Sequence, residues 1–165
     1  MVDESIDEHP LRPLLVASYR EFRIGRPRAA LDLLVPVIEH DERANRPSVM
    51  AGVLWGLAGD CHFWLDEPDK GFRAYRRAIE LDGRTGCLAL FACQVAWHRR
   101  AEDAEEALRC LRAARASDWQ AFRRHPIHVL HHSLGVEALY FRFVRVPLVK
   151  WRLHRLVAQA RSREE

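Results

Sequence analysis

The chain has 165 residues, a formal net charge of +3, and 48% hydrophobic and 30% charged residues, values that are ordinary for one folded domain with its own core. No apolar run approaches the ~18–20 residues that a membrane-spanning helix needs, and the first ten residues are acidic, whereas a secretory signal is basic and then apolar. We therefore expect a soluble, cytoplasmic protein.

The positive charge is concentrated near the C-terminus. Residues 1–122 contain 17 Lys or Arg and 20 Asp or Glu, whereas residues 123–165 contain 9 and 3. The basic character therefore belongs to the last part of the chain.

The four cysteines, Cys61, Cys87, Cys93 and Cys110, lie inside helical patterns and form no CxxC pair. Disulfide frameworks and zinc ribbons have different spacings, so we expect free, buried thiols.

The helical pattern begins after a polar, acidic segment. We expect residues 1–9 to be a flexible N-terminus and a helix to begin at Pro10, where apolar residues start to recur at intervals of three and four. Gly25 and Pro27 separate this helix from a second one. Pro36 lies within the second helix and is expected to bend it.

The most specific pattern lies in residues 52–83. Trp55, Gly59, Tyr75 and Ala78 occupy the fourth, eighth, twenty-fourth and twenty-seventh places of a helix-turn-helix unit of about 34 residues. Large residues at some of these places and small residues at others allow two antiparallel helices to approach closely. Gly59 and Ala78 are expected to make room for bulky neighbours.

The turn between these two helices is predicted at residues 66–69, because Pro68 suits the first turn of a helix. The same template gives a first repeat that starts at Leu11, with Gly25 at the turn place, and a third repeat that starts at Leu88. In the third repeat the turn is predicted at residues 100–103. Residues 41–51 connect the first two repeats and include an insertion.

This pattern resembles the tetratricopeptide repeat family. The resemblance covers about 110 residues and implies an all-α fold in residues 10–121, with three stacked helix-turn-helix repeats that form a short right-handed superhelix. Residues 122–165 depart from the repeat and are predicted to form a C-terminal helical extension of basic capping helices. Pro126 is expected to open its first helix, and Pro147 is expected to interrupt the pattern before the last one.

The resemblance also implies a concave groove that is lined by the first helix of each repeat. The side chains at its groove places combine aromatic rings with arginines, which suits a peptide with apolar anchors and some acidic character. The alternative is that the aromatic residues pack between repeats or under the C-terminal extension. The candidate groove residues are Tyr19, Phe22, Arg23, Asp60, Phe63, Trp64, Arg99 and Arg100.

One subgroup of the family grips a terminal carboxylate with Lys, Asn and Arg at defined groove places. The corresponding residues here supply no such charge, so we do not expect recognition of a C-terminal EEVD-type tail. A second subgroup, the translocator chaperones of type III secretion, has a length similar to that of this chain, but no residue pattern in the sequence settles whether the chain resembles it. The residues at the carboxylate-binding places are Leu15, Tyr19, Leu57, Ala89 and Cys93.

The histidine cluster is the most enzyme-like feature of the sequence. His125, His128, His131 and His132 are close enough on a helix for two of them to share a metal ion. No HExxH pattern and no carboxylate or Cys at ligand spacing accompanies them, so we expect no metal site. GxSxG and glycine-rich phosphate-binding patterns do not occur either, and we predict neither catalytic residues nor a cofactor.

The basic C-terminal residues alternate with apolar residues. This composition is typical of helices that lie on anionic membranes, and the same charges suit nucleic-acid phosphates. The simpler interpretation is a capping helix with an apolar face that is buried and a basic face in water. The residues concerned are Arg142, Arg145, Lys150, Arg152 and Arg155.

The sequence therefore predicts a non-enzymatic protein- or peptide-binding module that acts as an adaptor, scaffold or small chaperone, with another protein or a peptide as its partner. The alternative is a peripheral membrane or nucleic-acid-associated module that acts through the basic C-terminal helices. Of these two ligands an anionic membrane surface is preferred to nucleic acid. The oligomeric state stays open.

Overall fold

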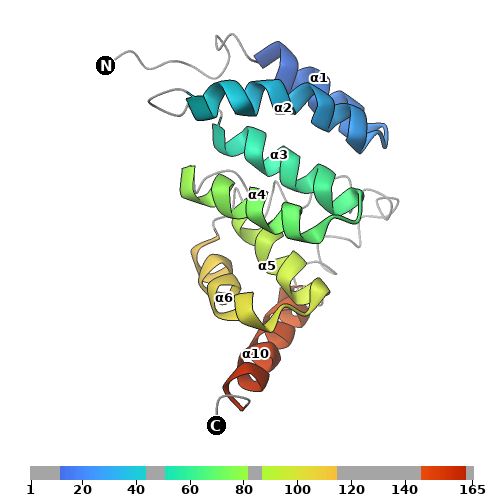
Figure 1. Ribbon diagram of the computed structural model, residues 1–165. Coiled ribbons are helices and arrows are strands. Elements are labelled where there is room, and N and C mark those ends of the chain that lie inside the picture. The colour runs from blue at the N-terminus through green and yellow to red at the C-terminus, as the bar shows by residue number, and fades with distance from the viewer. Residues whose placement is uncertain (1–11, 44–50, 82–86, 115–145, 163–165) are drawn as a thin grey trace. The chain divides into compact units, whose positions relative to one another are not determined.

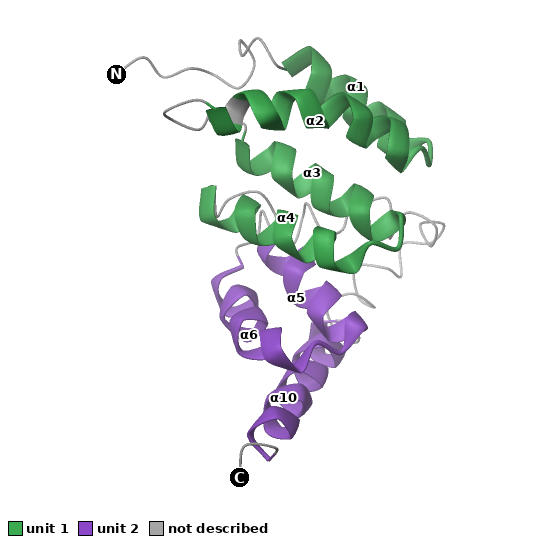
Figure 2. Cartoon of the chain, in the orientation of Figure 1, with its two compact units in different colours: residues 1–85 green, residues 86–165 purple. Residues whose placement is uncertain are grey.

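The computed structural model describes residues 12–43, 51–81, 87–114 and 146–162 (Figure 1). Within these ranges the regular structure is helical and contains no strand, so the predicted all-α class is confirmed for this part of the chain. The chain divides into two compact units, residues 1–85 and residues 86–165, which we call unit 1 and unit 2 (Figure 2). Each unit is described by itself.

Unit 1 contains two helix pairs. Helix α1 (Arg12–Arg23) packs against α2 (Pro27–Arg43), α3 (Ala51–Trp64) packs against α4 (Pro68–Leu81), and α2 also contacts α3. Helix α2 continues through Pro36, which lies inside it. The two pairs were predicted from the apolar spacing of the sequence.

The first helix of each pair in unit 1 ends in the same way. Gly25 and Asp66 have positive φ angles of 80° and 57°. The next residues, Arg26 and Glu67, donate backbone hydrogen bonds of 3.0 and 2.9 Å to residues five positions earlier. This αL ending satisfies carbonyl groups that a helix end would leave unpaired, and it reverses the chain so that the second helix can pack back.

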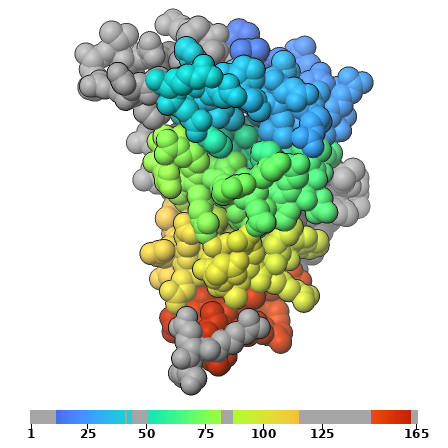
Figure 3. Space-filling model, viewed as in Figure 1, coloured from blue at the N-terminus to red at the C-terminus, as the bar shows by residue number. Residues whose placement is uncertain are grey.

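The apolar core of unit 1 joins the two pairs. Phe22 of α1, Leu34 and Val37 of α2, and Leu54 of α3 are all at most 2% exposed and lie in one core. The space-filling view shows side chains filling the gaps between the ribbons of this unit (Figure 3). Burial of these apolar surfaces stabilises the stacking of the pairs at about 25 cal/mol for each Å² removed from water.

Helices α3 and α4 approach closely at two glycines. A Cβ atom on Gly59 would lie 2.4 Å from the ring of Tyr75, and a Cβ on Gly71 would lie 2.7 Å from the ring of Phe63. Ala78 is fully buried. The role predicted for Gly59, which was to make room for a bulky neighbour, is confirmed.

Unit 2 contains α5 (Cys87–His98), a 3₁₀ turn η2 (Ala101–Asp103), α6 (Ala104–Ala113) and α10 (Val146–Arg161). Helix α5 packs against α6, and α10 contacts α5, η2 and α6. Pro147 lies in the first turn of α10, where its missing N–H costs little. The last predicted helix thus forms and packs on the third helix pair.

Helix α10 buries one apolar stripe. Val149, Leu153 and Leu156 are at most 9% exposed and lie three or four residues apart. Arg161 at its end forms an ion pair of 2.9 Å with Glu105 of α6. The helix predicted to begin at Pro126 lies outside the described residues.

None of the helices in the described ranges combines the length and the apolar character that a membrane crossing requires.

Candidate functional site

The predicted groove residues of α1 divide into exposed and buried side chains. Tyr19 is 41% exposed and Arg23 is exposed, so both can contact a ligand. Phe22 is completely buried, and its ring packs edge-on against Trp64 with centroids 5.6 Å apart. Phe22 therefore belongs to the core of unit 1, as the alternative interpretation of the aromatic residues stated. Trp64 is 37% exposed.

Two predicted groove residues of α3 also point into the interior. Asp60 is 7% exposed and accepts a hydrogen bond from the hydroxyl group of Tyr75. The half-buried ring of Phe63 packs edge-on against Phe72, at 5.0 Å between centroids, and against Tyr75. Both side chains thus contact α4: Asp60 is buried, and Phe63 keeps part of its ring exposed.

Arg99 and Arg100 were assigned to groove places of the first helix of the third repeat. The structure instead places both after the end of α5: Arg99 has φ 55°, and Arg100 Nε lies 2.8 Å from the buried carboxylate of Asp103. The cause is that the turn between α5 and α6 is longer than the turn between α3 and α4. Asp66 and Arg99, which both end a first helix, are 33 residues apart, whereas Pro68 and Ala104, which both begin a second helix, are 36 apart. Residues 101–103 supply the difference.

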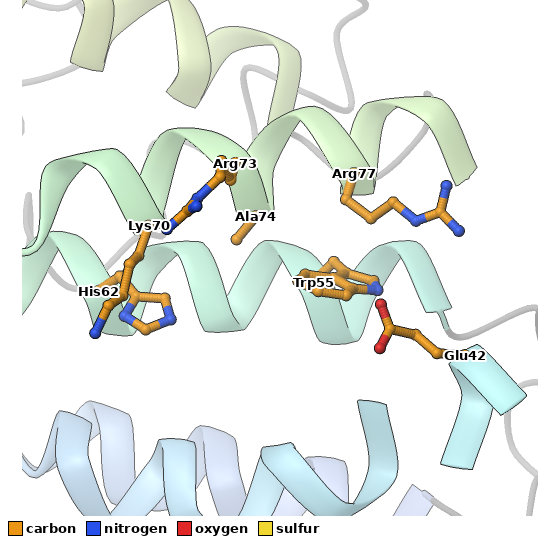
Figure 4. A pocket seen from close by; sticks show the side chains of 7 residues that line it. All are labelled: Glu42, Trp55, His62, Lys70, Arg73, Ala74 and Arg77. Carbon is orange, nitrogen blue, oxygen red and sulfur yellow. The ribbon is translucent and has the colours of Figure 1, made fainter. Parts of the chain in front are cut away.

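The structure brings together a different set of residues in unit 1. An open groove of about 410 Å³ lies along α3 and α4 and reaches the C-terminal end of α2. Figure 4 shows Lys70 and His62 at one end of this groove and Trp55 with Glu42 at the other. We call it the basic groove. Its lining residues are Glu42, Trp55, His62, Lys70, Arg73, Ala74 and Arg77.

Two helical stripes form the basic groove. Lys70, Arg73 and Arg77 follow one another on α4 at intervals of three and four residues, and Trp55 and His62 are two turns apart on α3. Residues at such intervals share one face of a helix, so the packing of α3 against α4 places cationic side chains opposite an aromatic ring and an imidazole.

Charges at one end of the groove are already neutralised. Glu67 lies 2.7 Å from His62 Nδ1 and 3.2 Å from Lys70 Nζ, and Arg28 of α2 reaches it at 3.4 Å. Hydrogen bonds from His62 and from Lys70 lower the pKa of Glu67 to about 2. Glu67 therefore stays ionised at neutral pH and holds the two side chains in place.

The two arginines of α4 that line the groove differ in their ion pairing. Arg77 pairs with Glu80 at 3.1 Å on the exposed side of α4. Arg73 is exposed, and no ion pair joins it to another residue of the described ranges. Its guanidinium group is therefore available for an anionic ligand.

The basic groove was not predicted, because the candidate binding residues were those at the first-helix places that the resemblance implies. The signal was present in the sequence as Lys70, Arg73 and Arg77 on one face of the predicted second helix. To predict the groove from this stripe, one would have to recognise that it faces Trp55 and His62 of the preceding helix.

The basic C-terminal residues are described only in part. On α10, Lys150 and Arg155 are exposed and Arg152 is half-buried, while Arg142 and Arg145 lie outside the described residues. The guanidinium of Arg155 lies 5.5 Å from the ring centre of Trp151, which is 55% exposed.

No group of three His, Cys, Asp or Glu side chains in the described ranges is arranged to hold a metal ion, and the cluster from His125 to His132 lies outside them. All four cysteines are free thiols. Burial raises the pKa of Cys61 to about 12 and that of Cys110 to about 11. Neither thiol is therefore an activated nucleophile.

No protein-family model, curated protein or solved structure matches the chain.

Proposed function

We propose that the chain is a non-enzymatic protein- or peptide-binding module, an adaptor, scaffold or small chaperone, built from tetratricopeptide-like helix pairs. The observation that carries the proposal is the basic groove. Its volume of about 410 Å³ lies within the roughly 300–1,000 Å³ typical of ligand sites. Both walls of the groove are helices that are fixed by a buried core, so the site is preformed.

The recurrent helix ending supports the repeat part of the proposal. Gly25, Asp66 and Arg99 all adopt positive φ after a first helix, and each is followed by a hydrogen bond from the next residue to a carbonyl five positions earlier. Repeated helix pairs expose extended surfaces on a rigid scaffold, and such surfaces are used for binding.

The test is affinity capture with the full chain. The tagged protein is incubated with a lysate of its source organism, and bound proteins are quantified against a matrix that carries the tag alone. We expect a small number of proteins to be enriched and the purified partner to bind saturably in calorimetry. Helical, folded protein that enriches no partner would contradict a binding module.

A second candidate function follows from α10. This helix buries Val149, Leu153 and Leu156 and leaves Lys150, Trp151 and Arg155 at the surface. Exposed Trp beside cationic side chains suits the surface of an anionic membrane. In this case the chain would sediment with phosphatidylserine vesicles, and Lys150→Glu with Arg155→Glu would abolish sedimentation. Absence of sedimentation at low salt would exclude this candidate.

A further inference from the structure

The charge distribution of the basic groove indicates what kind of ligand it takes. Residues 1–85 contain 12 Lys or Arg and 15 Asp or Glu, so unit 1 as a whole does not attract long polyanions. The cationic side chains are instead gathered on one face of α4, opposite Trp55 and His62 of α3. Such a local cluster favours a short anionic segment over an extended nucleic-acid backbone.

Arg73 is the residue best placed to hold an anion. Lys70 is engaged by Glu67 and Arg77 by Glu80, whereas Arg73 stands between them without an ion pair to any residue in the described part of unit 1. Its planar guanidinium can bind a carboxylate with two parallel hydrogen bonds. The neighbouring cations add attraction without having to leave their own partners.

A carboxylate, Glu42, lies at the other end of the groove, where Figure 4 also shows Arg77. Glu42 is exposed at the C-terminal end of α2, and no ion pair joins it to another residue that the structure describes. It lies beside the half-buried ring of Trp55 in Figure 4. A carboxylate accepts hydrogen bonds, for example from backbone N–H groups, and an indole ring packs against an apolar side chain.

We propose that the basic groove binds a short acidic peptide segment, with a carboxylate of the peptide on Arg73 and an apolar side chain of the peptide against Trp55. A peptide supplies all three complementary groups: carboxylates for Arg73, N–H donors for Glu42 and an apolar side chain for Trp55. This inference rests on the proposed binding function and names the chemistry of its partner.

The test uses a defined probe, a fluorescein-labelled capped peptide of alternating glutamate and leucine, and measures its binding to the full chain by fluorescence polarisation. The neutral control is the same peptide with glutamine in place of glutamate. We expect saturable binding of the acidic probe alone. Arg73→Glu should weaken it on the order of tenfold or more, which corresponds to at least about 1.4 kcal/mol.

Two matched variants separate the site from general charge effects. Arg109→Glu changes the net charge equally at an exposed position of α6 that does not line the groove. It should leave the affinity within about twofold, because exposed charges that do not contact the ligand are screened by salt. Arg73→Lys keeps the charge but removes the planar guanidinium, so its affinity for the probe should lie between those of the Arg73→Glu and Arg109→Glu variants. Equal losses in Arg73→Glu and Arg109→Glu would overturn the proposal.

Two further outcomes would assign the groove to another occupant and overturn the proposal. One is binding of a single-stranded oligonucleotide that is tighter than that of the acidic peptide and equally sensitive to Arg73→Glu. The other is a large gain in peptide affinity when residues 2–9 are removed, because this acidic segment of the chain would then be the natural ligand. A partner captured from lysate whose binding ignores Arg73→Glu would leave the proposed function intact and refute only the acidic-peptide site.

Discussion

Tyr75 contacts two consecutive residues of α3: its hydroxyl group donates a hydrogen bond to the buried carboxylate of Asp60, and its ring occupies the space beside Gly59. One side chain of α4 thus satisfies a buried polar group and fixes the distance between the helices. A buried polar group without a hydrogen-bond partner costs free energy, so this contact supports the packing of α3 against α4.

The first prediction concerns this contact. Gly59→Ala should lower the free energy of unfolding by about 1–3 kcal/mol, because the new methyl group would meet the ring of Tyr75 and the carbonyl oxygen of Gly71. Urea unfolding followed by circular dichroism measures the loss. Unchanged stability would show that α3 and α4 are not packed at this glycine.

The second prediction concerns pH. Hydrogen bonds from His62 and Lys70 lower the pKa of Glu67 in the folded chain from 4.5 to about 2. The stabilisation is therefore complete above pH 4.5 and is lost as the pH falls toward 2. Glu67→Gln should be less stable than the native chain at pH 7, and the difference should shrink as the pH approaches 2.

Glu39→Gln is the matched control for this titration, since the ion pair that Glu39 forms with Arg43 on the same helix is exposed. Its unfolding free energy should follow the pH dependence of the native chain. If Glu67→Gln also follows that curve, the charged cluster around Glu67 does not stabilise the fold.

The third prediction concerns thiol reactivity. Burial, with the nearby charge of Asp60, raises the pKa of Cys61 to about 12, and burial raises that of Cys110 to about 11. Few thiolates exist at pH 8, so iodoacetamide should label both residues slowly in the folded chain and rapidly in urea. Peptide mass spectrometry resolves the sites, and rapid labelling of Cys61 in native protein would contradict its burial.

The fourth prediction separates packing from charge on α10. Leu153→Ala should cost about 2–5 kcal/mol, because Leu153 is fully buried, whereas Arg161→Ala should cost at most about 1 kcal/mol, because its pair with Glu105 is exposed. Urea unfolding followed by tryptophan fluorescence compares them. Similar small effects would mean that α10 does not cap the third helix pair.

Local sequence signals predicted much of the fold. Pro68 after a turn and Gly59 opposite Tyr75 follow from rules that need no distant residue, and the structure agrees with both. The turn of the third repeat was predicted at residues 100–103, and the structure has a 3₁₀ turn at residues 101–103. The template has a first helix of fixed length, so it did not predict that α5 ends at His98, before the groove places given to Arg99 and Arg100.

The candidate site was harder to predict, because burial depends on how helices pack. The apolar spacing of Phe22 and Phe63 is the same whether their rings face a ligand or a neighbouring helix, and only the packed structure decides. The stripe of Lys70, Arg73 and Arg77 was visible in the sequence. What makes it a groove, the facing ring of Trp55, depends on the pairing of α3 with α4.

The central claim, that unit 1 binds its partner through the basic groove, can be tested by crosslinking because the chain contains only two lysines, Lys70 and Lys150. Lys70 lines the groove, and Lys150 lies on the exposed face of α10. An amine-reactive crosslinker is applied to the captured complex, and the linked peptides are identified by mass spectrometry. We predict crosslinks from Lys70 to the partner that disappear in Arg73→Glu; crosslinks from Lys150 alone would contradict the claim and assign binding to α10.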